Sequence, residues 1–87
     1  MNWSGIRVLV TGGASFIGSH LVDALVARGA TVTAVDDFSS GKLTNIQGHV
    51  DAARVRLVVG DLFREVVVNE SFKRQQVVFH LAADHGG

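Results

Sequence analysis

The stretch Thr11–Gly18, with the sequence TGGASFIG, decides the fold class of this chain. It follows a short β-branched run, Arg7–Thr11, which has the length and apolarity of a buried strand. It leads into the segment 17–28, where apolar residues recur at helical spacing, and Gly29 then supplies a natural helix stop. A strand, a glycine-rich turn and a helix in this order predict a dinucleotide-binding loop.

Further β-branched runs predict a parallel sheet. They are Thr31–Asp36, Val55–Gly60 and Val77–Leu81, and each is nearly continuously apolar, as strands buried on both faces are. The first predicted helix, 17–28, carries Ile17, Leu21, Ala24 and Leu25 on one stripe.

Shorter segments must provide the other crossovers. Leu43, Ile46 and Val50 predict a short helix that Gly48 weakens, and a third helix is placed at 63–73 because parallel strands need a crossover. The pattern β-α-β-α-β-α-β predicts an α/β chain with a Rossmann-type doubly wound parallel sheet.

The glycine-rich turn and one acidic residue favour a cofactor site. Glycines tolerate positive φ, and a helix N-terminus offers free N–H groups and partial positive charge to a pyrophosphate. Asp36 closes the second strand 18 residues after Gly18, where a carboxylate binds adenosine ribose hydroxyls. The alternative is a turn that binds nothing, with Asp36 capping a loop. Since Asp36-Asp37 is acidic and Lys42 is the nearby base, we predict NAD rather than NADP.

Composition narrows the remaining classes. The chain has 87 residues, which predicts at most one domain. It has no cysteine, which excludes disulfides. Its 8 basic and 8 acidic side chains balance, which argues against a nucleic-acid partner held by a basic surface. No apolar stretch suits a membrane span or a signal peptide, so we expect a cytoplasmic protein without a membrane partner. His80 and His85 lack a carboxylate or cysteine set, so no metal site is predicted.

Four motifs in this order resemble the extended short-chain dehydrogenase/reductase family, the NAD-dependent nucleotide-sugar epimerases and dehydratases. They are Thr11–Leu21 (TGGASFIGSHL), Val35–Gly41 (VDDFSSG), Gly60–Leu62 (GDL) and Val78–Ala83 (VFHLAA). The resemblance implies the strand order 3-2-1-4. The last residues, AADHGG, are similar to a stretch of GDP-mannose 3,5-epimerases.

The resemblance also implies the cofactor-binding residues. Those around the pyrophosphate are Gly12, Gly13, Ser15, Phe16, Ile17 and Gly18. Those around the adenosine are Asp36, Asp37, Phe38, Ser39, Ser40 and Gly41, with Asp61 and Leu62 at the adenine, and Leu81, Ala82 and Ala83 line the path toward the nicotinamide.

Two departures from the family pattern bear on function. Ser15 replaces the middle glycine, where a positive φ would cost a non-glycine residue roughly 1–2 kcal/mol; we expect binding to survive. The family's catalytic Tyr-x-x-x-Lys is absent, and the sequence contains no tyrosine.

These departures predict a partial NAD(P)-binding domain over 1–87, without the catalytic half or the sugar-nucleotide domain, and no catalytic residue. It would bind the ADP-ribose half of NAD and meet a nucleotide-sugar substrate only in an intact protein. The alternatives are a non-catalytic dinucleotide-binding or sensor module of the atypical short-chain dehydrogenase type, and a truncated product without stable function. The sequence leaves the oligomeric state open.

Overall fold

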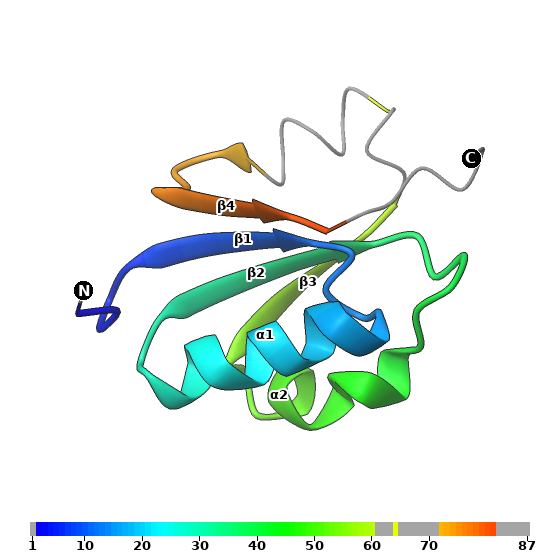
Figure 1. Ribbon diagram of the computed structural model, residues 1–87, viewed down its shortest axis with the longest axis horizontal. Coiled ribbons are helices and arrows are strands. Elements are labelled where there is room, and N and C mark those ends of the chain that lie inside the picture. The colour runs from blue at the N-terminus through cyan, green and yellow to red at the C-terminus, as the bar shows by residue number, and fades with distance from the viewer. Residues whose placement is uncertain (1, 61–63, 65–71, 82–87) are drawn as a thin grey trace.

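A computed structural model describes residues 2–60, 64 and 72–81. Within them, a parallel sheet has the strand order β3-β2-β1-β4, and helices lie on the first two crossovers (Figure 1). The elements are β1 (Arg7–Thr11), α1 (Phe16–Ala27), β2 (Thr31–Asp36), the 3-10 turn η1 (Leu43–Asn45), α2 (Gln47–Asp51), β3 (Val55–Val59) and β4 (Val77–His80). The predicted fold class and strand order are confirmed, and the predicted helix at 63–73 lies largely outside the described residues.

The register brings the carboxyl ends of the strands to one edge of the sheet. Thr11 pairs with Val35 on one side and with His80 on the other, and Asp36 pairs with Val59. Helix α1 begins at this same edge and runs back along the sheet (Figure 1). Ligands of open α/β sheets bind at this edge, so the fold places the predicted site there.

The main core lies between the sheet and the face covered by α1 and α2 (Figure 1). Val8, Val10 and Val32 point into it from the strands, and Val22 and Leu25 from α1. The apolar strand runs are therefore explained by burial, which contributes about 25 cal/mol per Å² of apolar surface. No described helix combines the length and apolarity that crossing a membrane requires.

Helix α1 is rotated relative to the stripe predicted from the sequence. Its buried residues are Gly18, Ser19, Val22 and Leu25, whereas Ile17 is 70% exposed. The prediction that Ile17 belongs to the inward stripe is therefore wrong. Successive residues on an α-helix are about 100° apart, so Ser19 and Ile17 lie on opposite sides of Gly18. The buried face extends from Gly18 toward Ser19, which leaves Ile17 in solvent. The end of α1 agrees with the prediction, since Gly29 has a φ of +83°.

The second crossover is shorter and more broken than one helix. The backbone of Ile46, with a φ of −128°, separates η1 from α2, and the Ile46 side chain is buried in the core. Burial of the Ile46 side chain therefore determines the backbone here and interrupts the helix.

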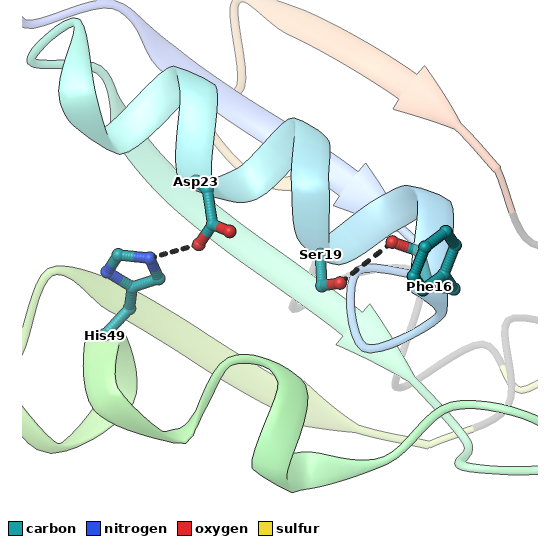
Figure 2. A network of polar contacts seen from close by, with 4 residues as sticks. All are labelled: Phe16, Ser19, Asp23 and His49. Carbon is teal, nitrogen blue, oxygen red and sulfur yellow. Dashed lines mark hydrogen bonds and ion pairs between the residues drawn. The ribbon is translucent and has the colours of Figure 1, made fainter.

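Two polar contacts lie on the face of α1 that meets α2. His49 of α2 donates from Nε2 to Asp23 Oδ1 of α1 at 2.6 Å, and Ser19 Oγ donates to the Phe16 carbonyl at 2.9 Å (Figure 2).

Candidate functional site

Ser15 caps α1 and fastens the glycine-rich loop. Its Oγ accepts a hydrogen bond from Gly18 N at 3.0 Å and donates one to the Gly12 carbonyl at 2.7 Å. Its φ of −68° and ψ of 166° are those of extended backbone, which any residue adopts. The strain considered for a serine in the middle-glycine place is therefore absent, because Gly12, with a φ of +72°, makes the left-handed turn instead.

The first turn of α1 leaves two backbone donors available. Gly18 N is taken by the cap and Ser19 N donates to Ser15 O at 2.8 Å, but among the described residues the N–H groups of Phe16 and Ile17 have no acceptor. The Phe16 and Ile17 side chains are 74% and 70% exposed. Free N–H groups at a helix N-terminus, with the partial positive charge of the helix dipole, are suited to binding an anion.

Two glycines permit the close packing of this loop. A Cβ on Gly18 would lie 2.0 Å from the Gly12 carbonyl oxygen, and a Cβ on Gly13 would lie 2.7 Å from Ala34 Cβ. The nearest neighbours of an added Cβ on Gly18 are thus atoms of the loop itself and not of a strand. Gly18 thus sets the distance between α1 and the turn that precedes it.

Asp36 connects the end of β2 to the glycine-rich loop. Its Oδ2 accepts a hydrogen bond from Ala14 N at 2.9 Å, and its Oδ1 accepts one from Phe38 N at 2.7 Å. The residue is only 7% exposed. Each carboxylate oxygen has a further lone pair, so the loop contacts leave acceptor capacity for a ligand hydroxyl. The loop-capping alternative is thus realised in the structure and is compatible with ribose binding.

The segment after β2 folds against the same loop. Asp37 Oδ1 accepts a hydrogen bond from Ser39 N at 2.9 Å, and Phe38 has a left-handed φ of 61°. Gly41 packs against Ala14, where an added Cβ would lie 2.7 Å from the Ala14 carbonyl carbon. The two ends of this predicted segment, Asp36 and Gly41, are therefore held against Ala14 in the loop that precedes α1. The left-handed φ of Phe38 is a strained conformation for a residue other than glycine.

At the neighbouring strand end, the hydroxyl of Thr11 joins β1 to β4. Thr11 Oγ1 accepts from Leu81 N at 3.0 Å and lies 2.8 Å from His80 Nδ1. This bond holds Leu81 at the carboxyl end of β1, and its predicted place on the path toward the nicotinamide stays a prediction. No role had been predicted from the sequence for the side chains of Thr11 and His80. Asp61, Leu62, Ala82 and Ala83 lie outside the described residues, so their predicted roles stay predictions.

The cap makes the stability of Ser15 variants predictable. Ser15→Ala is expected to lower the free energy of unfolding by about 1 kcal/mol, and Ser15→Gly by only a few tenths, because glycine is a tolerated N-cap. Urea denaturation of the three proteins measures these differences. Since φ is negative at this position, glycine should bring no relief of strain, and a Ser15→Gly variant more stable than the wild type would contradict the cap assignment.

The strand order of this parallel sheet defines a Rossmann-type fold. The glycine-rich turn before α1 and the acid at the end of β2 are features of the dinucleotide-binding class of this fold. The comparisons with known proteins then give the family. The model of the NAD dependent epimerase/dehydratase family matches residues 8–87, and the chain belongs to this family.

Individual relatives include enzymes that act on nucleotide sugars. UDP-glucuronic acid decarboxylase 2 of Arabidopsis thaliana is 40% identical over 78 residues, which are 90% of this chain and 16% of that protein. The structure of an epimerase from Methanothermobacter thermautotrophicus matches with a TM-score of 0.86 at 40% identity. The match covers 94% of this chain and 24% of the epimerase chain. UDP-glucose 4-epimerase of Thermus thermophilus, solved in complex with NAD, has a TM-score of 0.78 at 41% identity, covering 91% and 24%. This chain therefore spans between a sixth and a quarter of these relatives.

Proposed function

We propose that this chain binds NAD at the N-terminus of α1 and forms the ADP-ribose half of the cofactor site of a nucleotide-sugar epimerase or dehydratase. The observation that carries the proposal is the pair of Phe16 and Ile17 N–H groups, which have no acceptor among the described residues. They lie where strand, loop and helix meet at the carboxyl edge of the sheet. A pyrophosphate there would accept both hydrogen bonds and interact favourably with the helix dipole.

The adenosine ribose would bind beside Asp36. Its carboxylate is fixed by Ala14 N and Phe38 N, so it is oriented before the ligand arrives. The remaining lone pairs would accept hydrogen bonds from the ribose hydroxyls. A 2′-phosphate in the same place would put two negative charges close together in a site of low exposure, which supports NAD over NADP.

The other predicted positions complete this proposal. Asp37, Phe38, Ser39, Ser40 and Gly41 would surround the adenosine, with Asp61 and Leu62 at the adenine. Leu81, Ala82 and Ala83 would line the path toward the nicotinamide. The Thermus thermophilus relative in complex with NAD supports the cofactor, and the UDP-sugar enzymes among the relatives support a nucleotide sugar as the substrate of an intact protein.

Calorimetric titration with NAD and NADP tests the cofactor assignment. We expect saturable binding of one NAD per chain and an affinity for NADP at least about tenfold lower, because Asp36 would repel the 2′-phosphate. A melting temperature that rises with NAD would support the same conclusion. No heat and no shift in melting temperature at millimolar NAD would overturn the proposed function.

The absence of tyrosine leads to a separate prediction on catalysis. In the family, NAD accepts a hydride from the sugar while a tyrosine handles the proton, and this sequence has no tyrosine to do so. The purified 87-residue chain is therefore expected to show no epimerase, decarboxylase or dehydrogenase turnover with NAD and UDP-sugars. Turnover that co-purifies with the chain would contradict this prediction.

A further inference from the structure

The backbone of Ala14 is held at both of its polar groups by the segment that follows β2. Its N–H donates to Asp36 Oδ2 at 2.9 Å. Its carbonyl oxygen accepts from Lys42 N at 3.0 Å and from Asn45 Nδ2 at 2.8 Å. Ala14 is fully buried in the middle of the glycine-rich loop, so these contacts fix a part of the loop that solvent does not reach.

Gly41 makes this arrangement possible. A Cβ on Gly41 would lie 2.7 Å from the carbonyl carbon of Ala14, 2.9 Å from its oxygen and 2.9 Å from Asp36 Oδ2. Only glycine lets the chain pass so close, and the residues after Gly41 then come within hydrogen-bonding distance of the loop. The contact between Asn45 and Ala14 spans 31 positions of sequence, so it joins the first crossover to the second.

The amide of Asn45 acts on the peptide that precedes the helix cap. The carbonyl of Ala14 and the N–H of Ser15 belong to one planar trans peptide, so fixing one fixes the other. Ser15 N accordingly donates to Gly12 O at 3.1 Å, and Ser15 then caps α1. The free N–H groups of Phe16 and Ile17 come directly after this peptide, and their direction depends on it.

We propose that Asn45 is a positioning residue for the dinucleotide site: through the Ala14 carbonyl it holds the peptide that aims the N–H groups of Phe16 and Ile17 at the pyrophosphate. The inference rests on the proposed function and adds a residue outside the motifs that the sequence analysis used. Asn45 is placed for this role by η1, whose turn is closed by the hydrogen bond from Asn45 N to Lys42 O at 3.0 Å.

Asn45→Ala and Asn45→Asp test the proposal. Asn45→Ala removes the donor, and Asn45→Asp keeps the shape of the side chain but places an acceptor against the Ala14 carbonyl. We expect Kd for NAD, measured by calorimetry at a temperature where each variant is folded, to rise about tenfold for Asn45→Ala and further for Asn45→Asp. Asn45→Gln, which retains an amide donor, should recover part of the affinity.

Asn2→Ala is the matched control. Asn2 also forms a side-chain hydrogen bond with the backbone, accepting from Ser4 N at 3.0 Å, but at the amino end of β1. Asn2→Ala should leave Kd for NAD unchanged. Any stability that this variant loses would show the effect of removing a hydrogen bond that lies far from the site. If Asn45→Ala does not fold, the values of Kd for NAD of Asn45→Gln and Asn45→Asp are compared with that of the wild type instead.

The outcomes separate this inference from the proposed function. Wild-type affinity for NAD in folded Asn45→Ala or Asn45→Asp would overturn the positioning role alone. A wild-type chain that does not bind NAD would overturn the proposed function, and the inference with it. A rise in Kd for the Asn45 variants and none for Asn2→Ala would support both.

Discussion

Gly18→Ala is expected to lower the free energy of unfolding by about 3 kcal/mol or more and to abolish measurable NAD binding. The added Cβ would lie 2.0 Å from the Gly12 carbonyl oxygen. That oxygen also accepts hydrogen bonds from Ser15 N and Ser15 Oγ, and Gly12 N is bound to Val35 O at 2.7 Å. The loop therefore cannot withdraw without losing the cap of α1 or its attachment to β2. Chemical denaturation and NAD calorimetry measure the two effects.

Gly48→Ala is the matched control for that substitution. Gly48 lies in α2, and a Cβ there would meet nothing within 4 Å. Alanine at an open helical position should raise stability by about 0.5–1 kcal/mol and leave NAD affinity unchanged. Equal stability changes at Gly18 and Gly48 would contradict the close approach of α1 to the loop.

Asp36→Asn is expected to reduce NAD affinity by about 100-fold and stability by about 2 kcal/mol. Both carboxylate oxygens accept backbone N–H groups, from Ala14 and from Phe38. An asparagine has one oxygen, so its NH₂ group would face one of these donors and leave a buried N–H without an acceptor. The ribose hydroxyls would also lose a charged acceptor.

Asp51→Asn makes the same chemical change at an exposed position at the end of α2. We expect its stability to stay within about 0.5 kcal/mol of the wild type and its NAD affinity to be unchanged. The Asp36 variant should also discriminate less against NADP, because it lacks the negative charge. If Asp36→Asn bound NAD as tightly as the wild type, Asp36 would be a loop cap without a part in cofactor binding.

The sheet could be predicted from sequence because its strands are short, apolar and buried. Arg7–Thr11 and Thr31–Asp36 agree with β1 and β2 residue by residue, and the other two strands end one residue earlier than predicted. Helices were harder, since tertiary contacts override periodicity. The contact of Gly18 with the loop turns Ile17 to the outside, and the burial of Ile46 divides the second crossover.

Parts of the candidate site could be predicted where a residue type has a local reason to occur. Glycine at 12 and 18 and the acid at 36 follow from turn geometry, close packing and ligand chemistry, and the structure brings them together. Asn45 and Thr11 were not assigned roles, because each acts through a contact 31 or 69 residues away that no local pattern encodes. Polar side chains just after a cofactor motif are the signal that could have directed attention to Asn45.

A titration of the ¹⁵N-labelled chain with NAD, followed by two-dimensional amide NMR spectra, tests whether the cofactor binds at the N-terminus of α1. We expect the amide signals of Phe16 and Ile17 to shift most and those of the residues after Asp36 to shift nearly as much, while α2 signals such as that of Val50 hardly change. The largest shifts in α2, or no shifts at millimolar NAD, would contradict a cofactor site at the N-terminus of α1.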